Sequence, residues 1–146
     1  MADGQPVFSA AHGNMMPAKA LDATSLAAAC AALRRTVRMA ARRFLLVGTA
    51  DGPTARQIIT QETPPNSGDA AGVLQVVVDD RIAGSFYVTC DPAGRPTLVT
   101  AHLAGIDGPE LLSQDGWDID ARVYKGRDSF GAAVVSASAM IYTPGP

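Results

Sequence analysis

The sequence predicts a mixed α+β fold in one small domain. Its 146 residues suffice for a single domain with a modest core. Two helical segments and one short strand come first along the chain, and segments typical of strands fill the second half. Helices and strands that are grouped in this way favour α+β architecture. We expect an N-terminal arm over residues 1–20 and a single domain over residues 21–146, in which two main helices accompany a mixed β-sheet.

The arm and the first helix differ in their periodicity. Residues 1–20 show no hydrophobic period, so they are predicted to be a loop that needs a surface to pack against. Residues 21–43 are predicted to be a helix, and the apolar residues that recur on one face are Leu26, Cys30, Leu33 and Val37. An oxygen atom of Asp22, Thr24 or Ser25 can cap the first turn of this helix.

The elements that follow are a strand and a second helix. The continuous apolar run over residues 44–47 is typical of a strand that is buried on both faces. The second helix is predicted to begin after Asp51, to bury Ile58 and Ile59, and to end at the prolines of positions 64 and 65. Residues 65–72 are expected to be a polar loop.

The second half of the chain is predicted to be mainly strands. They are expected over residues 73–78, 85–90, 97–103, 118–124 and 130–142. Residues 118–124 alternate clearly, because Ile119, Ala121 and Val123 fall on one side and polar residues fall on the other. Residues 105–116 are predicted to be a loop, with one helical turn at residues 109–112.

Composition and charge exclude several functional classes. The formal charge of −2 provides no overall positive field for non-specific binding to nucleic acid. No apolar run approaches the roughly 20 residues of a membrane span, and we expect neither a signal peptide nor membrane contact. Cys30 and Cys90 lie far apart without a Cys or His cluster, so we expect two reduced thiols rather than a disulfide or zinc site. Only 18% of the residues are charged, which favours a chain that buries surface in an assembly.

Ser9 and His12 form the one pair that suggests catalysis. A serine nucleophile needs a base that is held within hydrogen-bonding reach and oriented by a third group. No acidic residue is placed to orient His12, so we expect Ser9 and His12 to make structural hydrogen bonds in a loop. His102 is expected to be an ordinary strand histidine rather than a metal ligand.

Two clusters of charged residues suggest binding sites. The acidic residues Asp79, Asp80, Asp115, Asp118 and Asp120 lack the spacing of a calcium loop, so we interpret them as turn and strand charges. The arginines are Arg34, Arg35, Arg38, Arg42 and Arg43. A solvated or intersubunit face is favoured for this cluster over contact with phosphate groups. We therefore predict no enzyme, no catalytic residue, no cofactor and no metal site.

Several stretches resemble one protein family in the same order along the chain. They are Val7–Asn14 (VFSAAHGN), Ser25–Arg35, Arg43–Val47, Thr54–Ile59, Leu74–Asp79, Gly108–Leu111, Gly116–Asp120 and Tyr124–Ala133. Together they are similar to the Mu-type prophage major head subunit family, a group of tailed-bacteriophage major capsid proteins that includes the capsid part of prohead protease–capsid fusions. In that family the stretch with Ser9 and His12 belongs to the capsid part and not to the protease.

The resemblance implies a fold and a function. It implies a tailed-phage capsid-like fold reduced to the axial domain and part of the peripheral domain, without the arm, extended loop and spine helix of the longer family members. It implies a virion structural protein, a capsid subunit or capsid-derived domain that self-assembles around a symmetry axis in the cytoplasm of a bacterial host. The expected partners are copies of the same chain and other capsid proteins, with packaged DNA as a weaker candidate. The alternative is a capsid-derived binding module, such as a cement, size-directing or interference protein that acts on a full-length capsid subunit.

Overall fold

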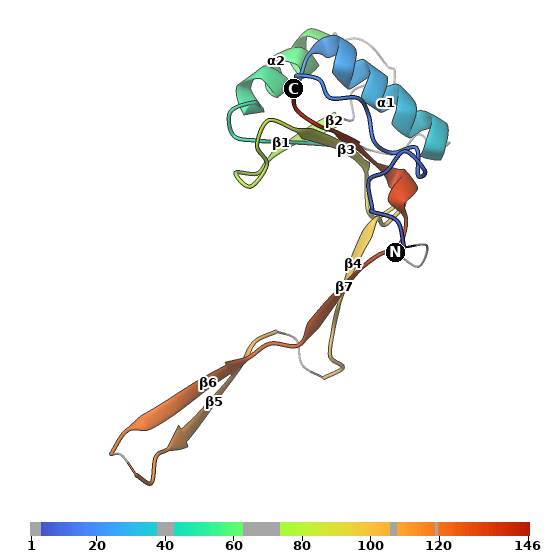
Figure 1. The fold of residues 1–146 in the computed structure, drawn as a ribbon. Helices are drawn as coiled ribbons and strands as arrows, with labels where there is room; N and C mark the ends of the chain where they lie inside the picture. Colours follow the sequence, from blue (N-terminus) through green and yellow to red (C-terminus); the bar gives the residue numbers. More distant parts are fainter. Residues whose placement is uncertain (1–3, 38–42, 63–73, 106–107, 119) are drawn as a thin grey trace. The chain divides into compact units, whose positions relative to one another are not determined.

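The computed structural model of the protein describes residues 4–37, 43–62, 74–105, 108–118 and 120–146 (Figure 1). The chain divides into two compact units, and each is described by itself. The first unit comprises residues 1–97 and 134–146, and the second unit comprises residues 98–133. The predicted α+β class is confirmed, because two helices accompany a mixed β-sheet. The predicted division into an arm and a single domain stays a prediction.

The first unit contains a four-stranded sheet in the order β2-β1-β3-β8. Its strands are β1 (Arg43–Val47), β2 (Leu74–Val78), β3 (Phe86–Cys90) and β8 (Met140–Thr143). Strand β1 runs parallel to β2 and antiparallel to β3, and β3 runs antiparallel to β8. The helices α1 (Ala23–Val37) and α2 (Gly52–Glu62) lie over one face of this sheet (Figure 1). Alternate residues of β1 and β3 are fully or nearly fully buried against them, which places the core between the helices and the sheet.

Helix α1 buries the face that its apolar spacing predicts. Leu26, Leu33 and Val37 are buried, and half-buried Cys30 packs against the same core. Asp22 caps the helix, since its carboxylate Oδ1 accepts a hydrogen bond from the backbone N–H of Ser25 at 2.6 Å. The Ser25 hydroxyl oxygen in turn accepts a hydrogen bond from the Asp22 N–H at 3.0 Å. This reciprocal pair satisfies two donors at the start of the helix.

The prediction that the first helix extends as far as Arg43 is wrong. Helix α1 ends at Val37, and residues 38–42, which include Arg38 and Arg42, lie outside the described residues. Arg43 is the first residue of β1, where it lies opposite Leu74 and Cys90. The strand begins at Arg43 because the apolar run that follows it pairs with strands on both sides. The predicted loop over residues 65–72 and the prolines at 64 and 65 also lie outside the described residues.

Two predictions for residues 105–124 are wrong. The loop predicted over residues 105–116, with one helical turn at residues 109–112, instead contains strand β5 (Glu110–Asp115). The adjacent Leu111 and Leu112 conceal the alternation of this strand, since neither of its faces is buried. The strand predicted at residues 118–124 is instead β6 (Arg122–Arg127), which pairs with β5 in antiparallel register. Asp118 and Asp120 therefore belong to the turn that joins these strands.

The long strand predicted over residues 130–142 is divided. It consists of β7 (Phe130–Val134), a short 3₁₀ helix η2 (Ala137–Ala139) and β8. The short Ala-Ser-Ala sequence has weak strand propensity, which fits an interruption between the two strands. Strand β7 pairs with β4 (Leu98–His102), and these two strands precede and follow the β5–β6 hairpin in the sequence.

The N-terminal loop pairs with the edge of β8. The N–H of Tyr142 donates to the carbonyl oxygen of Asn14 at 2.8 Å, and the N–H of Met16 donates to the carbonyl oxygen of Tyr142 at 2.8 Å. Phe8 packs against the rings of Tyr87 and Tyr142, with centroid distances of 5.5 and 5.1 Å. The surface that this segment packs against is therefore its own sheet. Within the described residues, no helix combines the length and hydropathy that a membrane crossing requires.

Candidate assembly surfaces

Asn14 fixes the N-terminal loop to the first unit. Its side chain is completely buried, and its Nδ2 group donates to the carbonyl oxygens of Val7 at 2.8 Å and Ala137 at 3.0 Å. Its Oδ1 atom accepts a hydrogen bond from the N–H of Ser9 at 3.0 Å. These three bonds use most of the capacity of a buried amide, which is costly to bury without partners. Sequence reasoning did not single out Asn14, because a lone asparagine in a loop gives no signal of burial.

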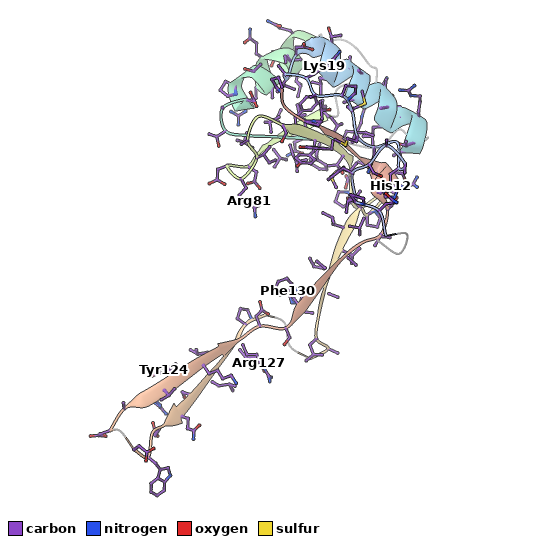
Figure 2. The ribbon with its side chains drawn as sticks, viewed as in Figure 1. His12, Lys19, Arg81, Tyr124, Arg127 and Phe130 are labelled. Atoms are coloured by element: carbon purple, nitrogen blue, oxygen red, sulfur yellow. The ribbon has the colours of Figure 1, made fainter. Side chains whose placement is uncertain are left out.

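Ser9 and His12 are hydrogen-bonded neighbours in the loop that Asn14 holds, and Figure 2 labels His12 there. The Ser9 hydroxyl oxygen accepts a hydrogen bond from the backbone N–H of His12 at 3.3 Å. The Nδ1 atom of His12 lies 3.1 Å from the carbonyl oxygen of Val7, which can accept its proton. These contacts tie the loop to itself, as expected of a structural role. That Ser9 is not a nucleophile stays a prediction, which labelling with a serine-directed phosphonate probe would test.

The other sequence candidates are dispersed. His102 is the exposed last residue of β4. Asp79 forms an ion pair with Arg81, and hydrogen bonds from Arg81 hold the pKa of the Asp79 carboxyl far below its usual range. Asp80 is exposed beside this pair, and Asp115 pairs with Arg122 at 3.2 Å. Across the part of the chain that the structure describes, no three His, Cys, Asp or Glu residues lie close enough to hold a metal ion.

The arginines and cysteines also occupy separate places. Arg34 and Arg35 are exposed on the last turn of α1, whereas Arg43 is buried in β1. The described arginines therefore do not share one helix face. Both cysteines are free thiols, and burial raises the pKa of the Cys90 thiol.

The second unit exposes most of the large apolar side chains that the structure leaves uncovered. They are Leu98, Val99, Leu103, Leu111, Leu112, Trp117, Val123, Tyr124 and Phe130. Trp117 is 98% exposed, and Leu111 and Phe130 are 73% and 67% exposed. The unit consists of two two-stranded sheets, and a two-stranded sheet alone is marginally stable in water. Exposed apolar surface of this extent makes the second unit the candidate for contact with a partner.

The β5–β6 hairpin combines this apolar surface with ordered charges. Glu110 lies opposite Arg127 in the strand register, and a carboxylate oxygen of Glu110 lies 2.6 Å from the Arg127 guanidinium. Asp115 and Arg122 form the corresponding pair at the other end. Figure 2 shows Tyr124 and Arg127 on this hairpin, with Phe130 farther along the chain on β7.

The second unit thus presents its exposed apolar side chains on two two-stranded sheets. The family model for phage capsid proteins matches residues 1–143. The chain therefore belongs to the phage capsid protein family. No curated protein matches the sequence.

Solved structures from phages share this fold. The capsid structure of cyanophage P-SCSP1u matches with a TM-score of 0.58 and 9% identity, covering 90% of this chain and 52% of that chain. A structure from Mycobacterium phage Patience matches with a TM-score of 0.56 and 14% identity, covering 88% of this chain and 46% of that one. A structure from Mycobacterium phage Che8 matches with a TM-score of 0.50 and 16% identity, covering 90% of this chain and 53% of that chain. The matched part thus spans about half the length of these chains.

Proposed function

We propose that this chain is a head subunit of the Mu-type group, or a capsid-derived domain, that self-assembles around a symmetry axis. Membership of the phage capsid protein family supports a virion structural role. The observation that carries the proposal is the second unit, whose sheets leave large apolar side chains in solvent. Association with further copies would bury these side chains and stabilise the strands.

The resemblance also suggests which part of a capsid subunit is present. The chain would supply the axial domain and part of the peripheral domain. The coverage of about half of each phage structure supports this correspondence. Assembly would take place in the cytoplasm of a bacterial host, with copies of this chain and other capsid proteins as partners. We further propose that the chain has no enzymatic activity and that its task is to form contacts.

The test is the oligomeric state of the purified chain. We expect rings or shells at micromolar concentration by sedimentation velocity and negative-stain microscopy. Trp117→Ala should weaken association at least about tenfold, because Trp117 is 98% exposed and tryptophan is enriched among the residues that dominate the binding energy of interfaces. Met15→Ala is the matched control, since Met15 is 47% exposed in the first unit and outside the proposed contact.

Two outcomes would count against the proposal. A single 15.1 kDa species across salt and concentration would exclude self-assembly of this chain. A monomer that nevertheless binds a full-length capsid subunit would favour the capsid-derived binding module instead.

A further inference from the structure

The charges of the β5–β6 hairpin are segregated by strand. The charged residues of strand β5 are both acidic, namely Glu110 and Asp115. The charged residues of strand β6 are all basic, namely Arg122, Lys125 and Arg127. A hairpin that needs charges only for solubility can mix both signs on each strand. Here the segregation gives the two long edges of one hairpin opposite signs.

Both edges of the hairpin are available for pairing. Within the described residues, β5 and β6 form a two-stranded sheet, so each strand uses one edge for its neighbour and leaves the other edge open. Neither strand contains a proline, and Lys125 is the one lysine in them. Proline and lysine are among the devices that prevent unwanted pairing at exposed edges. The open edges can therefore template another strand.

We propose that the open edge of β5 pairs with the open edge of β6 from the next copy of the chain. This inference rests on the proposed self-assembly. Contact between two β5 strands would bring acidic residues together, and contact between two β6 strands would bring basic residues together. Like charges directly opposite each other are destabilising in sheets, whereas opposite charges are favourable. The charge pattern thus selects a head-to-tail contact between different edges.

The register inside the hairpin shows how this contact can form. Repeating the same antiparallel register between copies places Glu110 opposite Arg127 of the next copy, and Asp115 opposite Arg122 of the next copy. Directly opposed residues lie on the same face of a sheet, so this pairing preserves the alternation of both strands. The inner and outer faces of each hairpin then continue into those of its neighbour.

Head-to-tail pairing also defines a symmetry. Each β5 strand runs antiparallel to the β6 strand beside it, so all hairpins in the assembly point in the same direction. Because the proposed assembly surrounds a symmetry axis, copies related in this way differ by a rotation rather than by a translation. A different-edge contact that closes forms a ring. The geometry therefore points to a cyclic contact, with one face of every hairpin turned inward.

A charge-swapped variant distinguishes this arrangement from pairing of like edges. It combines Glu110→Arg and Asp115→Arg with Arg122→Glu, Lys125→Glu and Arg127→Glu. Both ion pairs within the hairpin survive with reversed signs, so the variant should fold, as circular dichroism can verify. One of the two proteins, wild type or variant, is isotopically labelled. Both are dissociated, mixed and reassembled, and the composition of the assemblies is measured by native mass spectrometry.

We expect each protein to assemble alone and the mixture to sort into separate assemblies. Assemblies that contain both proteins should be at least about tenfold rarer than random mixing gives, because mixed contacts bring like charges together. Random mixing, or enrichment of mixed assemblies, would overturn the inference while leaving self-assembly intact. Enrichment is the result that pairing of like edges predicts. If the wild type alone stayed monomeric, the proposed function itself would fail.

A single substitution tests the same contact with less disturbance. Lys125 lies opposite Leu112, so Lys125→Glu leaves both ion pairs of the hairpin in place. In the proposed contact the new carboxylate would lie diagonally beside Glu110 of the next copy, where Lys125 is favourable. It should raise the dissociation constant of the assembly at least about fivefold at low salt, and by less at high salt, where charges are screened. Lys19→Glu is the control, because Lys19 is exposed in the N-terminal loop (Figure 2). Equal effects of the two substitutions would contradict the proposed contact.

Discussion

At the scale of single residues, two of the sites in the first unit that should tolerate substitution poorly can be tested directly. One is the approach of the chain's C-terminal end to the turn before β3. A Cβ atom added at Gly145 would overlap the carbonyl oxygen of Gly84 and lie 2.7 Å from its carbon. These atoms belong to the backbone, so they cannot move aside as a flexible side chain can.

Gly145→Ala is therefore expected to lower the free energy of unfolding by about 1–3 kcal/mol, the usual cost of forcing an extra methyl group into a packed site. Gly131→Ala is the matched control, since its added Cβ would have nothing within 4 Å. Its effect should stay within about 0.5 kcal/mol. Urea denaturation of both variants provides the measurement, and equal stabilities would show that the close approach is absent.

The second site is the buried side-chain amide of Asn14. Asn14→Leu removes all three side-chain hydrogen bonds and leaves the Val7 and Ala137 carbonyls and the Ser9 N–H without this partner. A buried polar group that loses its partner costs about 1–3 kcal/mol, so the variant should unfold at clearly lower urea concentration. Gln75→Ala is the control, because Gln75 is exposed on the edge strand β2. An Asn14→Leu protein as stable as the control would mean that the loop is not anchored by this amide.

At the scale of elements, the cap of α1 gives the fold a dependence on pH. The hydrogen bond from the Ser25 N–H, the largest cause, lowers the pKa of Asp22 below its ordinary value of 3.8. A carboxyl with a lowered pKa in the folded state contributes stability that is fully present above the unfolded pKa. This contribution is lost as the pH falls through the folded pKa.

Asp22→Asn separates the cap from its charge, because asparagine also caps helices but does not titrate. We expect the melting temperatures of wild type and Asp22→Asn to differ most near neutral pH and to converge as the pH falls through the lowered pKa of Asp22, below its ordinary value of 3.8. Thermal melts followed by circular dichroism across this range provide the measurement. A constant difference at all pH values would show that the ionised form of Asp22 has no special role.

The elements that the sequence predicts well are those whose burial is one-sided. In α1, the spacing of Leu26, Leu33 and Val37 indicates both the helix and its inward face, because the sheet lies on one side only. The core strands β1 and β3 were also located within about one residue. Prediction fails where no face is buried, as in β5 with its adjacent Leu111 and Leu112. Periodicity cannot indicate a strand that has no buried face.

The residues of the candidate assembly surface were likewise hard to predict, because they have no buried face. The exposure of Trp117 and Leu111 could not be read from the sequence, since apolar residues are normally expected inside. Ser9 and His12 attracted notice as chemical groups, whereas the structure shows their loop to be held by Asn14. The charges of Asp115 and Arg122 become informative only when the strand register places them opposite each other.

At the scale of the whole molecule, the two units differ in how they are stabilised. The first unit has a buried core between helices and sheet, which can support folding without a partner. The second unit has exposed strands and its apolar side chains lie in solvent. If the second unit serves assembly, removing it should abolish association and leave the first unit folded.

The backbone allows this removal at a defined place. The N–H of Val135 donates to the carbonyl oxygen of Thr97 at 2.8 Å, so the two segments that flank the second unit are hydrogen-bonded neighbours within the first unit. Replacing residues 98–133 with a short Gly-Asn turn should therefore give a folded protein with a cooperative thermal transition. We expect it to be monomeric by sedimentation at concentrations where the full chain assembles, and not to enter wild-type assemblies. Assembly of the shortened protein would place the contacts in the first unit, and its failure to fold would show that the core needs the hairpins.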